Sequence, residues 1–235
     1  MNIKQLLKEL CGILRRFFFG VSDNSFLKYH NVFDHLAELK SALIQLNREG
    51  KTRILDVGGA DGAFLKSIIA DCGDQLKANF VIEVLDLEID GSSNPTDVLI
   101  RQGDICSAAL KEHFTEKYDC IFTYNAMEHF HDPISAADNM CSLLRPGGHI
   151  LCSTVFSWRF HPVPNDYFRY TDQALEYLFS KRNGLKLLKC GYDLSRRREN
   201  ITGGYFADKD IPPGDYLGGF RENWIVTYIG CKPGS

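Results

Sequence analysis

A glycine-rich turn, residues 56–62 with the sequence DVGGADG, ends an apolar run that begins at residue 53, and its residue types suggest chemistry. Because glycine has no Cβ, the main chain at Gly58, Gly59 and Gly62 can turn sharply and come close to a ligand. A helix is predicted to begin near Asp61, and the unpaired N–H groups of its first turn favour an anion such as a carboxylate or phosphate. The turn therefore indicates a binding site for a ligand with an anionic group.

Two common nucleotide-binding loops differ from this turn. A P-loop requires Gly-Lys-Ser/Thr, which the turn lacks. The G-x-G-x-x-G fingerprint of dinucleotide-binding proteins requires glycine where Ala60 and Ala63 stand. A nicotinamide-dependent oxidoreductase, which uses a similar sheet, is thus an alternative with the wrong glycine spacing.

Further polar side chains follow later apolar runs. Glu128 and His129 come just after the run 118–126, and a histidine side chain can accept a proton near neutral pH. The proline-stiffened segment 161–169 precedes a helix that is expected to be capped near Thr171 or Asp172. Its polar side chains are predicted to form a substrate-binding wall beside the strand ends: His161, Asp166, Tyr167 and Arg169.

Apolar strands that alternate with helices are predicted to position these residues. Strands are expected at 53–57, 80–88, 97–105, 118–126, 149–157, 185–194 and 224–232, and helices at about 61–76, 133–144 and 172–179. This alternation is typical of an α/β protein with a doubly wound, mostly parallel seven-stranded sheet and helices on both faces. Ligands bind such sheets beyond the carboxyl ends of the strands, where the strand order reverses.

Two segments outside this pattern are expected to be separate features. Residues 1–50 are predicted as an N-terminal helical segment that forms a lid or a dimer contact, and residues 51–235 as the α/β domain. Apolar residues at helical spacing over 3–18 indicate an amphipathic helix that packs on its own domain or on a second subunit, and a second helix is expected over 31–48. A membrane-surface helix is the less favoured alternative for residues 3–18. Glycines and prolines near 195–222 predict a long loop or insertion.

The composition excludes several classes of protein. The net charge of −3 over 235 residues gives no general attraction to nucleic acid, so no nucleic-acid partner is expected. No apolar run reaches the roughly 18 to 20 residues that span a bilayer, and the N-terminus lacks the features of a signal peptide. The eight cysteines are scattered without a Cys-x-x-Cys pair, which predicts reduced thiols in a cytoplasmic protein.

The order of these motifs resembles that of the class I S-adenosylmethionine-dependent methyltransferases. Their first motif, Asp/Glu-x-Gly-x-Gly-x-Gly, is matched by Asp56, Gly58, Ala60 and Gly62, with alanine as a small departure. Four more stretches follow in the family's order: FVIEVLDLE, GDI, YDCIFTYNAMEHF and LLRPGG. The segment HPVPNDYFRYT is similar to the HP-x-P-x-DY-x-R-x-T segment of small bacterial-type methyltransferases, many of which belong to glycan and natural-product pathways.

The resemblance implies a Rossmann-like class I fold and a cofactor site for S-adenosylmethionine, with S-adenosylhomocysteine as product. In that site Asp86, with Glu88 as second choice, would hold the ribose hydroxyls, and Asp104 would accept from the adenine amino group. The full set that the family implies comprises the glycine turn and residues at three later strand ends: Asp56, Gly58, Gly59, Gly62, Asp86, Glu88, Asp104, Ile105 and Asn125.

The implied reaction moves a methyl group to a hydroxyl or amine of a small molecule or a glycan precursor. A hydroxyl acceptor must lose its proton, and His129 is the first candidate for the base, with His161 second. No group of Asp and His has metal-ligand spacing in the sequence, so a metal-independent enzyme is expected. A non-catalytic module that keeps the methyltransferase fold is the remaining alternative.

Overall fold

A computed structural model describes residues 31–47, 51–73, 79–88, 98–110, 114, 117–158, 160–162, 164–193 and 224–234. The predictions for the helix at 3–18 and for the insertion near 195–222 lie outside these residues. None of the helices within the described ranges has the length and apolarity that a membrane-spanning segment requires.

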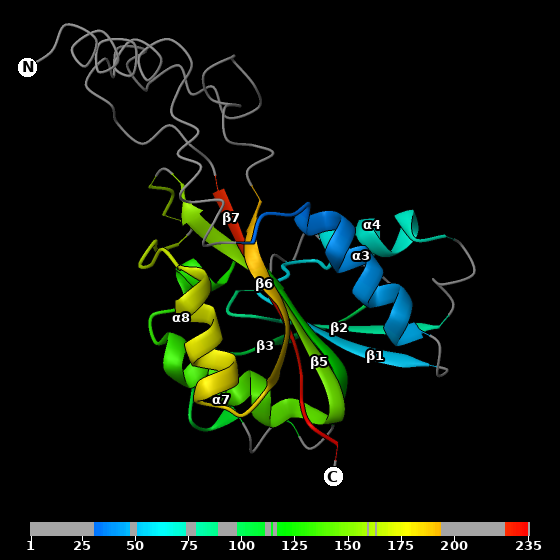
Figure 1. Cartoon of the computed structure of the whole chain (residues 1–235). Helices are drawn as coiled ribbons and strands as arrows, with labels where there is room; N and C mark the ends of the chain where they lie inside the picture. Colours follow the sequence, from blue (N-terminus) through cyan, green and yellow to red (C-terminus); the bar gives the residue numbers. More distant parts are fainter. Residues whose placement is uncertain are drawn as a thin grey trace, which may run out of the picture. The chain divides into compact units, whose positions relative to one another are not determined.

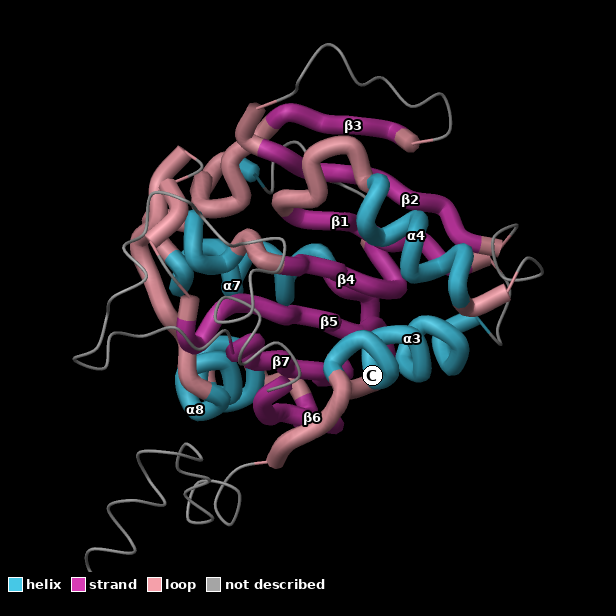
Figure 2. Tube along the Cα trace, turned by 90° about the horizontal axis from the view of Figure 1, so that it is seen from above, coloured by secondary structure: helices cyan, strands magenta, loops and turns pink. Residues whose placement is uncertain are grey.

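One seven-stranded sheet with the order β3-β2-β1-β4-β5-β7-β6 forms the centre of the fold (Figure 2). Strands β1 to β5 pair in parallel, whereas β7 is antiparallel to both β5 and β6. The strand order reverses between β1 and β4, so the predicted doubly wound, mostly parallel sheet is confirmed. The strands are β1 Thr52–Val57, β2 Phe80–Asp86, β3 Leu99–Gln102, β4 Tyr118–Tyr124, β5 Leu144–Ser157, β6 Lys186–Asp193 and β7 Trp224–Cys231.

Helices cover both faces of the sheet (Figure 1). On one face lie α3 His35–Leu46 and α4 Ala63–Asp71, and on the other α7 Pro133–Leu143 and α8 Asp172–Glu176, which continues as a π-helical turn Tyr177–Lys181. A short 3₁₀ helix, Met127–His129, follows β4.

Short polar side chains cap three of these helices, α3, α7 and α8, at their first turns. Asp34 accepts from the Ala37 N–H at the start of α3, and the Asp132 side chain caps α7. The Thr171 side chain accepts from the Ala174 N–H, which confirms the predicted cap of α8. Each cap satisfies a backbone donor that the first helical turn leaves unpaired.

The sheet and α3 share one apolar core. Leu39 and Leu43 of α3 are fully buried against Ile54 of β1 and Leu65 of α4. The compact unit that contains the sheet begins at Val32, which also forms a bridge to Tyr192. Helix α3 lies within the predicted N-terminal segment 1–50, and its buried face packs against both the sheet and α4. The domain division near residue 50 stays a prediction.

Candidate functional site

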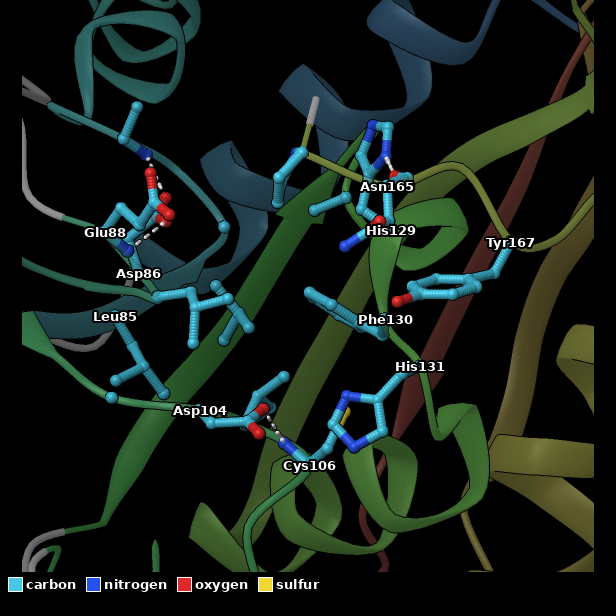
Figure 3. Close-up of a pocket in the computed structure, with 18 of the residues that line it drawn as sticks. Leu85, Asp86, Glu88, Asp104, Cys106, His129, Phe130, His131, Asn165 and Tyr167 are labelled. Atoms are coloured by element: carbon cyan, nitrogen blue, oxygen red, sulfur yellow. Dashed lines mark hydrogen bonds between the residues drawn. The ribbon is translucent and has the colours of Figure 1, made fainter. Parts of the chain in front are cut away.

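A cavity of 390 Å³ lies beyond the carboxyl ends of β1, β2 and β4, where the strand order reverses. Figure 3 shows Asp86 and Glu88 on one side of it and Phe130 and Tyr167 on the other. Sheets of this type bind ligands at this position. The residues that line the cavity are Val57, Gly58, Ala60, Leu85, Asp86, Leu87, Glu88, Gly103, Asp104, Ile105, Cys106, Asn125, Ala126, His129, Phe130, His131, Pro164, Asn165 and Tyr167.

The glycine turn needs its glycines for two steric reasons. Gly58 has φ +73°, and a Cβ placed there would lie 2.5 Å from the Cβ of Ala126. A Cβ on Gly59 would lie 2.3 Å from the carboxyl carbon of Asp56. Gly58 lines the cavity, whereas Gly59 faces Asp56 and Gly62 faces Val84. Of the three glycines predicted to contact the cofactor, Gly59 and Gly62 therefore do not line the cavity and instead allow the turn to pack against the residues beneath it.

Asp56 lies beneath the turn and is only 2% exposed. Burial raises the pKa of this carboxyl to about 8, and the neighbouring charges of Asp86 and Asp61 act in the same direction. Its side chain is not among those that line the cavity, although the family resemblance implies a place for Asp56 in the cofactor set.

Replacing Asp56 by asparagine is expected to flatten the pH dependence of folding stability between about pH 4 and pH 8. The folded chain keeps the carboxyl proton up to its pKa of about 8, whereas the unfolded chain releases it near the ordinary pKa of 3.8. The free energy of unfolding of the parent protein therefore falls as pH rises through this window. Asparagine has a similar shape and no titrating proton, so its contribution does not change with pH.

Urea unfolding of both proteins at about pH 5 and pH 8 measures this difference, since all other titrating groups are common to the two chains. The variant should gain stability relative to the parent at the higher pH. Parallel stability profiles would mean that Asp56 is ionised in the folded protein.

Asp86 connects the end of β2 to the glycine turn. Its Oδ2 accepts from the Ala60 N–H at 2.9 Å, and its Oδ1 lies 3.4 Å from the Glu88 N–H. Glu88 is exposed at the rim. Helix α4 begins at Ala63 rather than near Asp61, and the Ala63 N–H donates to Asp61 Oδ1 at 2.9 Å. The Ala63 N–H, one of the backbone donors expected to face an anionic ligand, is therefore already paired with the Asp61 side chain.

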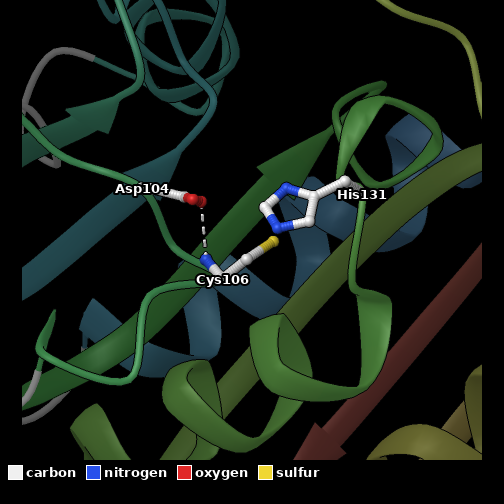
Figure 4. Close-up of side chains that lie close together, drawn as sticks. All are labelled: Asp104, Cys106 and His131. Carbon is white, nitrogen blue, oxygen red and sulfur yellow. Dashed lines mark hydrogen bonds between the residues drawn. The ribbon is translucent and has the colours of Figure 1, made fainter.

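The wall formed by the loop after β3 contains Asp104, Ile105 and Cys106. Asp104 Oδ1 accepts from the Cys106 N–H at 2.8 Å, and the Asp104 and Cys106 side chains lie beside His131 (Figure 4). Burial raises the pKa of the Cys106 thiol to about 11, so it is neutral at physiological pH. The described cysteines are free thiols, in agreement with the sequence: Cys72, Cys106, Cys120, Cys141, Cys152, Cys190 and Cys231.

Asn125, directly after β4, has a side-chain oxygen without a hydrogen-bond partner in the part of the chain that the structure describes. The residue has φ +48°, a left-handed conformation that asparagine adopts more readily than most side chains. Its Oδ1 is buried and accepts no hydrogen bond from the described residues, although buried polar atoms are normally paired. A ligand donor in the cavity would satisfy this oxygen.

The opposite wall joins the end of β4 to the proline segment. His129 Nδ1 donates to the Asn165 carbonyl oxygen, which leaves Nε2 as the nitrogen with a lone pair in the neutral ring. The Glu128 carbonyl accepts from the Tyr167 N–H at 2.9 Å and from the Phe168 N–H at 3.2 Å. These bonds fix the proline segment against the 3₁₀ helix, and the Tyr167 ring faces the cavity (Figure 3).

Three residues predicted for substrate binding form a braced group outside the cavity wall. The Arg169 guanidinium donates through both terminal nitrogens to Asp166 and lowers the pKa of that carboxyl to about 2. Asp166 Oδ2 also accepts from the His161 N–H at 2.8 Å. The His161 ring lies against the His129 ring, with 5.0 Å between centroids. Asp166 and Arg169 thus hold the shape of the segment that carries Tyr167 and His161.

Several cavity residues have no counterpart among the sequence predictions. Cys106, Phe130, His131, Pro164 and Asn165 all line the cavity. Each lies within two residues in sequence of a predicted site residue, so the spacing of the motifs contains a partial signal. Their side-chain directions depend on how the loops fold.

Comparison with known proteins gives one family and many similar folds. A family model described as a methyltransferase domain matches residues 29–189. The structure of the [4+2]-cyclase SpnF is 16% identical with a TM-score of 0.58, and the alignment covers 84% of this chain and 81% of that one. An S-adenosylmethionine-dependent methyltransferase from Mesorhizobium loti is 15% identical with a TM-score of 0.51, over 82% and 96% of the two chains.

A third structure contains the cofactor itself. Phosphoethanolamine N-methyltransferase 2 from Haemonchus contortus, in complex with S-adenosylmethionine, is 14% identical with a TM-score of 0.52, over 83% of this chain and 52% of that one. At such identities these likenesses show a shared fold alone. No curated protein sequence matches the chain.

Proposed function

Since this chain belongs to the methyltransferase domain family, we propose that it transfers a methyl group from S-adenosylmethionine to a hydroxyl or amine of a small molecule or glycan precursor. The observation that carries the proposal is the convergence of Gly58, Asp86, Asp104 and Asn125 on one cavity at the switch point of the sheet. These four lie at the carboxyl ends of four different strands, and the family resemblance implies that residues at these positions hold the cofactor.

The residues present fit this cofactor. The unpaired Asn125 Oδ1 can accept from an ammonium or amino group, and Asp86 and Glu88 can accept from ribose hydroxyls. Asp104 and Ile105 also line the cavity, which supports the proposal that they recognise the adenine ring. Asp56, Gly59 and Gly62 support the turn from outside the cavity.

When bound, the cofactor supplies a sulfonium methyl group: the bond from the acceptor oxygen or nitrogen to the methyl carbon forms as the S–C bond breaks, and the electron pair leaves on sulfur. The protein must hold the acceptor in line with that bond, an arrangement that can contribute roughly 7 to 11 kcal/mol to catalysis. The acceptor side is the wall of Tyr167 and His129. We propose His129 first and His161 second as the catalytic residues.

The expected location, partners and N-terminal segment remain proposals. Buried free thiols agree with a cytoplasmic protein, and the net charge of −3 agrees with a partner other than nucleic acid. A lid or homodimer contact formed by the N-terminal segment, residues 1–50, is retained as a proposal, as is the less favoured membrane contact of residues 3–18.

Calorimetry with the purified chain tests the cofactor site. S-adenosylmethionine and S-adenosylhomocysteine are expected to bind, whereas NAD is not, because the glycine spacing is wrong for it. Asp104→Ala should weaken binding by about 1.5 to 3 kcal/mol, the value of a hydrogen bond to a charged group. Glu88→Ala should cost less, because Asp86 remains to hold the ribose.

Circular dichroism of both variants checks that they fold. This control is needed because Asp104 also accepts a hydrogen bond from the Cys106 N–H, which helps to form its loop. Unchanged affinity in a folded Asp104→Ala protein would remove Asp104 from the site. Binding of NAD in preference to both sulfur ligands would instead favour an oxidoreductase. Cofactor binding without transfer to any acceptor would favour a non-catalytic module.

A further inference from the structure

Three electron-rich side-chain atoms converge behind the acceptor wall, from segments that are far apart in sequence. Glu128 Oε1 lies 3.9 Å from His129 Nε2 and 3.7 Å from His161 Nε2. The ligand-type atoms of the three residues all lie within 4.8 Å of one another. We call this group, Glu128, His129 and His161, the Glu-His-His cluster.

Within this cluster, Glu128 has a buried carboxylate oxygen that lacks a hydrogen-bond partner in the described residues. The residue is 0% exposed, and its Oε2 accepts from the Thr154 hydroxyl at 2.6 Å. Its Oε1 is buried and has no hydrogen-bond partner in the described part of the chain. A buried carboxylate oxygen without a donor or a cation is costly, so this atom points to something that binds beside it.

The two histidines face Oε1 with the nitrogen suited to coordination. His129 uses Nδ1 as donor to the Asn165 carbonyl, so its Nε2 is the lone-pair nitrogen of the neutral ring. His161 Nδ1 lies 3.3 Å from Asp166 Oδ2, and its Nε2 is the atom nearest Glu128. Outer partners of this kind, a carbonyl and a carboxylate behind the ring, are what metal-binding histidines usually have.

We propose that Glu128, His129 and His161 bind a divalent transition-metal cation of the Zn²⁺ type. Two ligand atoms held about 2.1 Å from one ion at a tetrahedral angle lie roughly 3.4 Å apart. The separations of 3.7 and 3.9 Å exceed this by a few tenths of an ångström, which small side-chain rotations can close. Two imidazoles and one carboxylate suit zinc and leave a position open for another ligand.

The described residues contain two other groups of similar composition, and both fit an ion less well. In the group of Asp104, Cys106 and His131 (Figure 4), Asp104 Oδ1 already accepts from a backbone N–H. Burial raises the pKa of the Cys106 thiol to about 11, which makes the thiolate that a metal binds more costly to form.

In the group of Asp34, His35 and Asp193, both ring nitrogens of His35 already have partners. Nδ1 contacts Asp193 and Nε2 lies 3.0 Å from the Tyr124 hydroxyl. Asp34 caps α3. Among these three groups, the Glu-His-His cluster therefore fits a cation best, because Glu128 Oε1 has no hydrogen-bond partner in the described residues.

The role of the ion rests on the proposed function, although its binding does not. An acceptor hydroxyl that occupied the open position would lose its proton to solvent more readily, because a bound cation lowers the pKa of a coordinated oxygen. The histidines then act as metal ligands and not as the base that the sequence suggested. The expectation of a metal-independent enzyme arose because residues 128–129 and 161 are separated in sequence.

Titration of the metal-depleted full chain with Co²⁺, followed by its visible absorption, tests the proposal without any acceptor or methyl donor. The parent is expected to bind one equivalent with the spectrum of a site containing nitrogen and oxygen ligands, and Zn²⁺ should displace it. Glu128→Gln and His161→Asn should each weaken binding by about 100-fold or more, beyond the 10- to 100-fold cost of losing an outer partner. His149→Asn, a histidine outside all three groups, should leave it unchanged.

Circular dichroism confirms that each variant is folded, and glutamine at 128 keeps the shape of the side chain. The proposal is overturned if the folded parent binds no Co²⁺, or if tight binding survives either substitution. It is also overturned if His131→Asn abolishes binding while Glu128→Gln retains it. Calorimetry with S-adenosylmethionine on the same samples separates the two proposals. Binding of S-adenosylmethionine without binding of Co²⁺ would contradict only the proposed metal site. Binding of Co²⁺ without binding of S-adenosylmethionine would contradict only the proposed methyltransferase function.

Discussion

Replacing His129 by alanine is expected to lower turnover by about 10² to 10⁴ while S-adenosylmethionine affinity stays within a few-fold of the parent value, the range typical of a lost proton-transfer group. His129 is the histidine on the acceptor wall, and its Nε2 faces Glu128. Loss of the ring removes either a proton acceptor or a metal ligand next to the acceptor. Both roles act on the chemical step more than on cofactor binding.

The measurement is the initial rate of S-adenosylhomocysteine formation with an acceptor found by screening hydroxyl- and amine-bearing metabolites and glycan precursors. His149→Ala is the matched control, because His149 lies at the amino end of the β4–β5 pairing, away from the cavity. A His129→Ala protein that turns over at the parental rate would show a structural role for this histidine. The search for the catalytic group would then move to His161 and Tyr167.

Gly58→Ala is expected to reduce cofactor affinity by about 100-fold, which corresponds to about 2.8 kcal/mol of binding free energy. The new methyl group would lie 2.5 Å from the Ala126 Cβ, so either the turn or the end of β4 must move. Both form the cavity wall. The left-handed φ of +73° adds strain of roughly 1 to 2 kcal/mol, which appears as lower stability.

Gly184→Ala separates these two effects. Gly184 also has φ +73°, but nothing lies within 4 Å of a Cβ placed there, and it is outside the cavity. This variant should lose similar stability and keep the cofactor affinity of the parent in calorimetry. Equal affinity of Gly58→Ala and Gly184→Ala would show that the turn does not approach the cofactor.

The sequence determines the order of the elements and the edge of the sheet at which the site lies. Largely apolar runs, such as residues 225–231, predict buried strands, and strands that alternate with helices are typically parallel. Parallel strands bring their carboxyl ends to one edge, so Gly58, Asp86, Asp104 and Asn125 could be assigned to one site before their contacts were seen. Local capping also follows from sequence, as at Thr171.

Other properties depend on which side chains meet, and spacing along the chain does not contain that information. The burial of Asp56 beneath Gly59, which raises its pKa, exists only once the turn folds back over the strand end. Asp166 and Arg169 have the composition of a binding pair, but in the fold each is satisfied by the other. Helix α3 joins the domain because Leu39 and Leu43 find apolar partners on the sheet.

The Glu-His-His cluster shows most clearly which properties follow from the sequence and which arise only from the tertiary structure. The sequence places Glu128 and His129 after a strand and His161 on a proline segment, and each residue alone has an ordinary explanation. Backbone hydrogen bonds from Tyr167 and Phe168 to the Glu128 carbonyl bring the two segments together. Only then do two ring nitrogens face a buried oxygen without a donor, because convergence of side chains from distant segments is set by tertiary packing and not by local sequence.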